Sequence, residues 1–117
     1  MKIFITGTAG FIGFSLAKVL LENNHTIHGY DGITNYYDIK LKDSRNKILK
    51  KYKKFSFTKG MLENKNLLNK TIVKFKPEII IHLAAQAGVR YSLDKPRTYL
   101  SSNIMGTYNI VELAHKV

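Results

Sequence analysis

The sequence contains no cysteine and no tryptophan, and only two of its 117 residues are proline. The absence of cysteine excludes both a disulfide framework and a thiolate metal site. The four histidines, at positions 25, 28, 82 and 115, are scattered without the spacing of metal ligands, so we expect no metal site. The length is sufficient for one compact domain with a modest core, and it leaves no room for a second domain.

Long apolar runs are also missing. No stretch approaches the ~20 consecutive apolar residues that a membrane helix needs. The opening segment, MKIFITGTAGF, is apolar, but threonine and glycine interrupt it within a few positions, which is unlike a signal peptide. We therefore expect a cytoplasmic protein that makes no contact with a membrane.

Acidic residues are scarce, with 8 against 19 basic residues and a formal net charge of +11. An excess of this size makes an acidic partner worth considering. The densest basic segment, residues 40–54, fits an amphipathic helix with most of its lysines, Lys42 among them, in water. Nucleic-acid-binding surfaces usually carry several arginines and exposed aromatic side chains, which this segment lacks, so a nucleic-acid patch is only the alternative. The expected apolar side is Leu41, Ile48, Leu49 and Tyr52.

Short apolar segments alternate with amphipathic helical patterns along the whole chain. Strands alternating with helices of this length predict right-handed crossovers and a parallel sheet covered on both faces. The expected fold class is therefore α/β, a doubly wound parallel sheet of the Rossmann type with strand order 3-2-1-4. The predicted strands are residues 2–6, 26–30, 55–59 and 78–82, and the predicted helices are residues 11–23, 40–54, 64–76 and about 96 to the end.

The carboxyl-terminal elements predict an incomplete sheet. The fourth strand, IIIH, has the apolar character of a central strand, yet strand order 3-2-1-4 leaves it at an open edge. The last helix carries two apolar stripes, and Gly106 lies where a close neighbour would pack. We therefore expect the remaining strands to be missing or supplied by another chain, and the last helix to mediate self-association. The two stripes are Leu100, Ile104, Tyr108 and Val111, and Met105, Ile110, Leu113 and Val117.

The segment TGTAGFIG, between the first strand and the first helix, places Gly7, Gly10 and Gly13 at intervals of three. In that position glycines let the chain turn, let a pyrophosphate approach the backbone, and let the helix pack closely on the sheet. Asp31 ends the second strand, about 20 residues further on, where a carboxylate binds a ribose 2′-hydroxyl and repels a 2′-phosphate. We predict NAD as the cofactor in preference to NADP. A plain Asp-Gly turn before Gly32 is the alternative explanation for Asp31.

The segments TGTAGFIG, NYYD, AQAGVRYS and SNIMGTYNI together resemble the amino-terminal part of extended short-chain dehydrogenases/reductases. The resemblance is greatest to the nucleotide-sugar epimerases that act on UDP-glucuronate at carbon 4. It covers all 117 residues but only about the first third of such an enzyme, so it implies an NAD-binding portion over residues 1–117, without the substrate domain or the catalytic segment. It implies NAD and a UDP-sugar as ligands, with Arg90 beside the sugar. The residues that it places at the cofactor are Gly7, Gly10, Phe11, Ile12, Gly13, Asp31, Asn35, Tyr36, Leu62, Leu83, Ala84, Ala85, Gln86 and Asn103.

The chain departs from the family pattern after the third strand. There the family usually has Gly-Asp, whose aspartate holds the adenine amino group, whereas Gly60 is followed here by Met61. A thioether is a poor hydrogen-bond acceptor, so we expect this contact to be lost at a cost of about 1 kcal/mol.

Two features resemble catalytic groups without the expected setting. Tyr91 and Lys95 have the four-residue spacing of a catalytic tyrosine and lysine, but Pro96 disfavours helix at Lys95, so the pair is expected in a loop. Tyr36 and Lys40 match the same spacing by chance. The true pair of the family follows a fifth strand, so we expect no catalytic residue in this chain. For His82, at the end of the fourth strand, we expect a structural imidazole held by neighbouring backbone rather than a general base.

The sequence therefore predicts the NAD-binding portion of a UDP-glucuronate 4-epimerase-like protein. One alternative is a non-catalytic dinucleotide-binding or oligomerising remnant of such an enzyme. A basic module that binds nucleic acid is the third possibility.

Overall fold

The computed structural model describes residues 1–33, 39–85 and 93–116. In these ranges four parallel strands form one sheet in the order β3-β2-β1-β4. The predicted fold class and strand order are confirmed, and each strand lies within a residue of its predicted bounds. The strands are β1 (Lys2–Thr6), β2 (Thr26–Asp31), β3 (Phe55–Lys59) and β4 (Ile79–His82).

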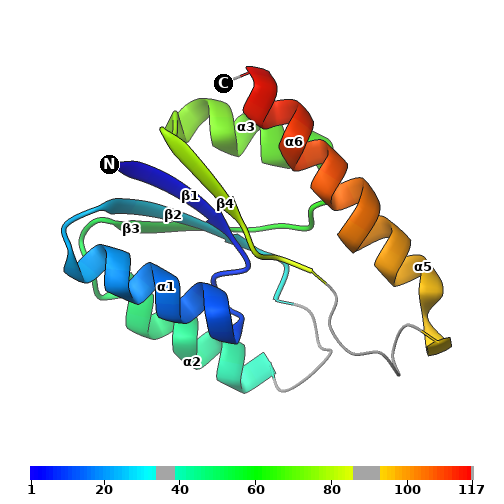
Figure 1. The fold of residues 1–117 in the computed structure, drawn as a ribbon. Coiled ribbons are helices and arrows are strands. Elements are labelled where there is room, and N and C mark those ends of the chain that lie inside the picture. The colour runs from blue at the N-terminus through cyan, green and yellow to red at the C-terminus, as the bar shows by residue number, and fades with distance from the viewer. Residues whose placement is uncertain (34–38, 86–92, 117) are drawn as a thin grey trace.

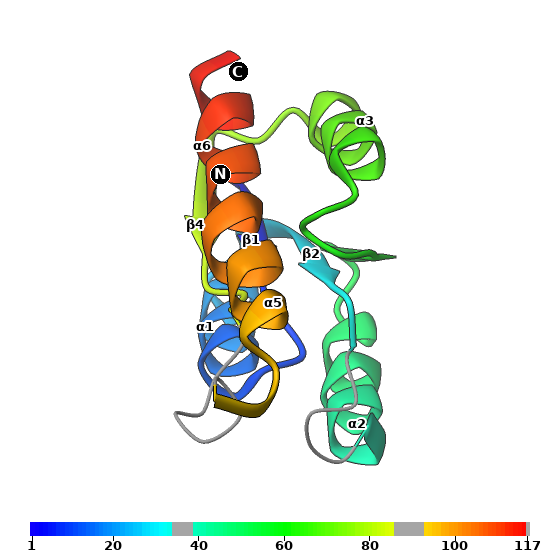
Figure 2. The same ribbon diagram turned by 90° about the vertical axis from the view of Figure 1, so that its right-hand side faces the viewer.

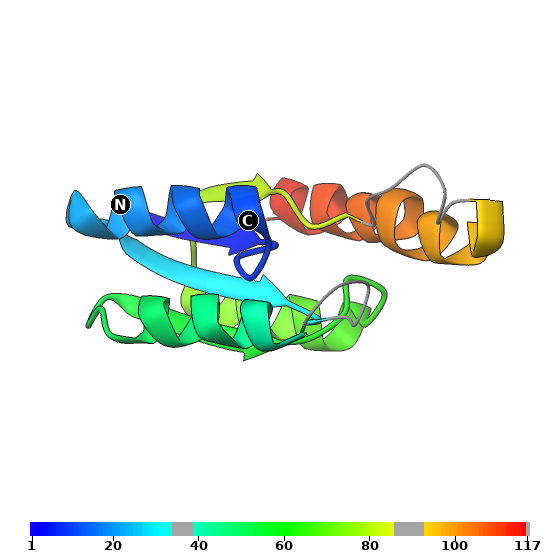
Figure 3. The ribbon, with the colours of Figure 1, turned by 90° about the horizontal axis from the view of Figure 1, so that it is seen from below.

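Helices cover both faces of the sheet, as Figures 1 and 2 show. One layer holds α1 (Phe11–Glu22) and α2 (Ile39–Lys50), which lie side by side in Figure 3. The other layer holds α3 (Lys65–Phe75) and the last helix. The last helix begins at the predicted residue but is not α-helical throughout, because α5 (Pro96–Tyr99) continues as a π-helical segment, η1 (Leu100–Met105), before α6 (Gly106–Lys116).

The alternation of side chains along β1 divides the core into two halves. Ile3 and Ile5 face α1 and α2, whereas Phe4 faces α3 and α6. Each half is closed by leucines from its helices, such as Leu49 on one side and Leu68 on the other, both fully buried. Burial of side chains of this size stabilises the fold by about 1.5–3 kcal/mol each.

The buried side of α2 differs from the predicted one. Leu41 and Ile48 are 45% and 40% exposed, whereas Lys42 is only 7% exposed. The helix contacts both α1 and β3, and its residues that face these neighbours are Lys42, Asn46 and Leu49. The prediction that Lys42 faces water is therefore wrong, because a long lysine stem can cover apolar surface as well as a leucine can. The helix also ends at Lys50, before a tight turn leads into β3.

The helix predicted over residues 11–23 is confirmed as α1, but two of its larger apolar side chains lie outside the contact with the sheet. Gly13, Ala17 and Leu21 are buried, while Ile12 and Val19 are 67% and 55% exposed. The small residues Gly13 and Ala17 let the first part of the helix approach the sheet closely. An apolar strip on α1 is thereby left open.

The open edge predicted for β4 is observed, since the only pairing found for β4 in the described part of the chain is with β1. Ile79 on β4 is 39% exposed. On the last helix Ile110 and Leu113 are buried, whereas the stripe Leu100, Ile104, Tyr108 and Val111 is more than half exposed. Whether further strands continue this sheet stays a prediction.

Within residues 1–33, 39–85 and 93–116, no helix is long and apolar enough to span a bilayer. The cytoplasmic location expected from the sequence stays a prediction.

Candidate functional site

The loop between β1 and α1 makes a sharp turn at the carboxyl edge of the sheet. Gly7 begins it with a positive φ of 85°, a conformation that glycine adopts without strain. The Gly7 N–H donates to the Tyr30 carbonyl on β2 at 2.8 Å, and the Gly10 N–H donates to the Gly7 carbonyl at 3.0 Å. The loop is therefore fixed to both central strands.

Close approach explains the spacing of the glycines. A Cβ atom on Gly7 would lie 2.8 Å from the Ala84 nitrogen, and one on Gly13 would collide with the backbone carbonyl of Gly7. Neither neighbour is a flexible side chain that can move aside. The first turn of α1 thus packs directly on the loop, as the TGTAGFIG pattern predicts.

The amino terminus of α1 is open. Its N-cap, Gly10, has extended backbone angles and no side chain to bond the first amides, and the first turn contains no acidic residue. Phe11 and Ile12 are 71% and 67% exposed. Unpaired amides and the positive end of the helix dipole make such a terminus suitable for an anion such as a phosphate group.

The Asp31 carboxylate joins the end of β2 to this loop. Its Oδ2 accepts the Ala9 N–H at 3.0 Å, and its Oδ1 accepts the Ile33 N–H at 2.7 Å. The second bond forms the turn that the alternative explanation predicts, and the first bond shows that the same carboxylate also holds the glycine loop. Each carboxylate oxygen has room for a further donor, such as a hydroxyl group.

Arg45 on α2 is a residue of this region that the sequence analysis missed. Its Nη1 donates to the Ala9 carbonyl at 3.0 Å, across 36 residues of sequence. Arg45 is the only arginine of residues 40–54, but no local pattern in that segment indicates a contact with the glycine loop. The signal for this contact lies only in the packing of α2 beside α1.

A second polar cluster connects β1, β4 and the last helix. Thr6 Oγ1 accepts the N–H groups of Leu83 and Ala84 at 3.0 and 3.1 Å and lies 2.7 Å from His82 Nδ1. Because the hydroxyl already accepts two bonds, its proton points to Nδ1, which leaves Nε2 to donate to Thr107 Oγ1 at 2.9 Å. Burial lowers the pKa of His82. His82 is a neutral link between elements, and its partners are threonine hydroxyls rather than the expected backbone groups.

The remaining predicted site residues lie in several environments. Leu83 is 38% exposed, Ala84 lies against Gly7, and Ala85 is exposed. Asn103 is half-buried in η1, and Leu62 is buried against Gly106. A Cβ atom on Gly106 would lie 2.6 Å from Leu62 Cβ, which confirms the predicted close neighbour. The predicted residues outside the described ranges are Asn35, Tyr36, Gln86 and Arg90.

The possible catalytic spacing can be tested at one end only. Tyr91 lies outside the described residues, while Lys95 is exposed and caps α5 with non-helical angles of φ −133° and ψ 64°. Lys95 itself is non-helical, as expected before Pro96, but Leu93 and Asp94 are helical, so the expectation of a loop is wrong at these two residues. Among the described histidines and carboxylates, no group of three is arranged to hold a metal ion.

This fold, with a glycine loop, an open helix terminus and a carboxylate on the next strand, defines a Rossmann-type α/β protein of the class that binds dinucleotides at this edge. The profile of the GDP-mannose 4,6-dehydratase family matches residues 4–117. The chain belongs to this family. The expected resemblance to nucleotide-sugar epimerases of the extended short-chain group is also confirmed by individual relatives.

A probable UDP-glucuronate 4-epimerase of Rhizobium meliloti is 48% identical over 117 residues, which are 100% of this chain and 34% of that protein. Protein CapI of Staphylococcus aureus is 53% identical over 112 residues, which are 96% of this chain and 33% of that protein. The Bacillus cereus UDP-glucuronic acid 4-epimerase, solved with UDP-glucuronic acid and NAD, superposes with a TM-score of 0.91 at 32% identity, covering 100% of this chain and 37% of that one. The chain thus spans about a third of the length of these relatives.

Proposed function

We propose that this chain is the NAD-binding, amino-terminal portion of a nucleotide-sugar 4-epimerase that acts on UDP-glucuronate or a similar sugar. The observation that carries the proposal is the open glycine loop, held at Ala9 by the carboxylate that ends β2. Support comes from the relatives, among which the Bacillus cereus enzyme was solved with both NAD and UDP-glucuronic acid. Residues 1–117 would then form the first part of one NAD-binding domain, and the substrate domain would lie outside them.

The residues of the loop fit the cofactor. The glycines leave the backbone accessible, and the uncapped amides of Phe11 and Ile12 suit a pyrophosphate. Asp31 suits the adenosine ribose and would repel a 2′-phosphate, which favours NAD over NADP. We also propose that Arg90 contacts the sugar. The remaining residues that we propose to contact NAD are Asn35, Tyr36, Leu62, Leu83, Ala84, Ala85, Gln86 and Asn103.

Bound NAD would supply reversible hydride transfer at C4 of the sugar. This chain would bind and orient the cofactor and close one side of its site. The proton-transferring tyrosine and lysine would come from a segment that follows a fifth strand. We therefore expect residues 1–117 alone to bind NAD and to leave UDP-glucuronate unchanged.

Calorimetric titration of the chain with NAD and with NADP tests this proposal. We expect an affinity for NAD in the micromolar range and weaker binding of NADP. The Gly13→Val variant, whose side chain would collide with the Gly7 carbonyl, should lose binding, and Ala114→Val at an exposed position of α6 should keep it. Failure of the unaltered chain to bind NAD would refute the proposal, and turnover of UDP-glucuronate would refute the assignment of catalysis to another segment.

The exposed stripe on the last helix favours a second, non-catalytic role, and we propose that it pairs with a second copy of the chain. Ile104 and Val111 are 59% and 61% exposed, which is unusual for a contiguous apolar stripe on a monomer. Light scattering should show a dimer that Ile104→Lys converts to a monomer, while Val73→Lys on α3 leaves the dimer intact. A monomer at all concentrations would exclude this role. Salt-sensitive DNA binding without NAD binding would favour the nucleic-acid alternative instead.

A further inference from the structure

Two side chains from different elements hold Ala9, the residue in the middle of the glycine loop. Asp31, at the end of β2, accepts the Ala9 N–H at 3.0 Å, and Arg45, on α2, donates to the Ala9 carbonyl at 3.0 Å. Ala9 itself is fully buried, so neither bond is exchanged easily for a bond to water. The N–H of this loop residue is thus bound by a carboxylate, and its carbonyl is bound by a guanidinium group.

The position of Ala9 explains why this double contact matters for binding. Ala9 precedes Gly10, the N-cap of α1, so its orientation sets the direction in which the first amides of the helix point. Hydrogen bonds to charged groups are about twice as strong as neutral ones, and they fix geometry as well as energy. The Arg45 bond therefore ties the anion-binding end of α1 to α2, in addition to the contacts between the two helices.

The charges of the two side chains also bear on selectivity. Asp31 ends β2 at the position where a carboxylate repels a 2′-phosphate, and a nearby arginine is the group that accommodates such a phosphate in related folds. Arg45 and Asp31 bond to the same loop residue, so both charged groups lie beside Ala9 at the carboxyl edge of the sheet.

We propose that Arg45 positions the glycine loop for dinucleotide binding and supplies positive charge at the ribose end of the site, so that the Asp31 carboxylate is what excludes a 2′-phosphate. This inference rests on the proposed function. Arg45 is a positioning residue in the unaltered chain, and it becomes a phosphate-binding residue when the neighbouring carboxylate is neutralised.

The positioning role is tested with Arg45→Gln, and Lys47→Gln serves as the matched control because Lys47 is an exposed cation on the same helix. Arg45→Gln should weaken NAD binding about tenfold, as loss of a charged hydrogen bond predicts, and should speed hydrogen exchange at the Ala9 amide. Lys47→Gln should change neither quantity. Arg45→Lys, which keeps the charge without the planar fork, should fall between the two.

The selectivity role is tested with Asp31→Asn, alone and combined with Arg45→Gln. Asp31→Asn should raise the affinity for NADP relative to NAD about tenfold, and adding Arg45→Gln should abolish that gain. An equal gain in both backgrounds would overturn the selectivity role, and unchanged exchange at Ala9 in Arg45→Gln would overturn the positioning role. If the unaltered chain binds no NAD, the proposed function and the selectivity role both fail, while hydrogen exchange still decides the positioning role.

Discussion

Among single residues, Met61 is where we expect this chain to depart from the family pattern, and its surroundings show where such a difference would act. Its sulfur packs against Gly32, directly after Asp31, and its carbonyl accepts the Tyr30 hydroxyl at 2.8 Å. Gly60 leaves space for that hydroxyl, since a Cβ atom there would lie 2.5 Å from it. The thioether therefore lies beyond β3 at the same edge as Asp31, where the adenosine half of a dinucleotide would bind.

We predict that Met61→Asp strengthens NAD binding about fivefold, because a carboxylate would accept the adenine amino group for a gain of about 1 kcal/mol. Met61→Leu, which offers no acceptor, is the matched control and should leave the affinity unchanged. The measurement is calorimetric titration with NAD and with its hypoxanthine analogue, which lacks the amino group. An equal gain for both dinucleotides would show that Met61 does not face the base.

His28 provides a prediction about pH. Its ring nitrogens lie 2.6 and 2.8 Å from the hydroxyls of Ser56 and Thr58, and its ring stacks on Phe4. Burial, assisted by the charge of Lys74, lowers the pKa of His28 from 6.5 to about 4. In the unfolded chain the imidazole takes up a proton near pH 6.5, so the free energy of unfolding must fall as the pH falls from about 6.5 toward 4.

We expect this loss to be about 2 kcal/mol for the half-buried His28, measured by urea unfolding at pH 7.5 and pH 4.5. His28→Gln should be less stable at neutral pH but should lose less stability on acidification. His115→Gln, at an exposed position of α6, should keep the pH dependence of the unaltered chain. A pH dependence that persists undiminished in His28→Gln would assign the effect to other groups.

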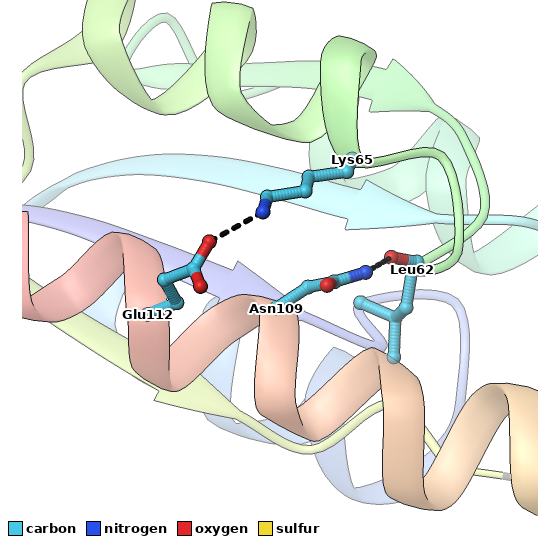
Figure 4. A network of polar contacts seen from close by, with 4 residues as sticks. All are labelled: Leu62, Lys65, Asn109 and Glu112. Atoms are coloured by element: carbon cyan, nitrogen blue, oxygen red, sulfur yellow. Dashed lines mark hydrogen bonds and ion pairs between the residues drawn. The ribbon is translucent and has the colours of Figure 1, made fainter.

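At the scale of elements, a short polar interface holds α6 to the start of α3 and to the segment that precedes it (Figure 4). The Asn109 amide donates to the Leu62 carbonyl at 2.9 Å, and Lys65 pairs with Glu112 at 2.5 Å. Asn109 is only 7% exposed, so water cannot easily replace the hydrogen bond between its amide and the Leu62 carbonyl. These two contacts therefore attach α6 to the amino-terminal end of α3.

Removing the amide should leave the Leu62 carbonyl buried without a partner. We predict that Asn109→Ala lowers the free energy of unfolding by about 1–3 kcal/mol. Asn69→Ala, the same change at an exposed position of α3, is the matched control and should stay within about 0.5 kcal/mol. Urea unfolding of the three proteins measures both values, and equal stability of the two variants would mean that water replaces the lost bond.

The elements also show how far the sequence alone specifies this structure. The strand bounds and the bounds of α1 and α3 follow from local periodicity, and the glycine loop follows from TGTAGFIG, because these depend on neighbours in the chain. The buried face of α2 does not follow from local periodicity. Lys42 is buried and Leu41 is exposed, because contacts with α1 and β3 decide which side of the helix is covered. Arg45 was missed for the same reason, since its partner Ala9 lies 36 residues away.

At the scale of the whole molecule, the sheet ends on an apolar edge. Ile79 on β4 is 39% exposed and Val19 on α1 is 55% exposed, while Ile81 packs only partly into the core beneath α1. A central strand of a parallel sheet is normally covered on both faces and paired on both edges. The relatives are about three times as long as this chain, which supports the proposal that a further strand and helix cover this surface.

We therefore predict that residues 1–117 form a complex with the rest of a relative when both are expressed together. The partner is Staphylococcus aureus CapI without the first third of its length, which corresponds to the part matched here. Light scattering should show a one-to-one complex, since a parallel strand beside β4 would bury Ile79 and satisfy the amides of that edge. Ile79→Asp should abolish the complex by burying a charge, whereas Val73→Asp, an exposed position on α3, should not. The prediction is wrong if the two soluble partners do not associate, or if the complex still forms with Ile79→Asp. Either result would show that no further strand pairs with β4.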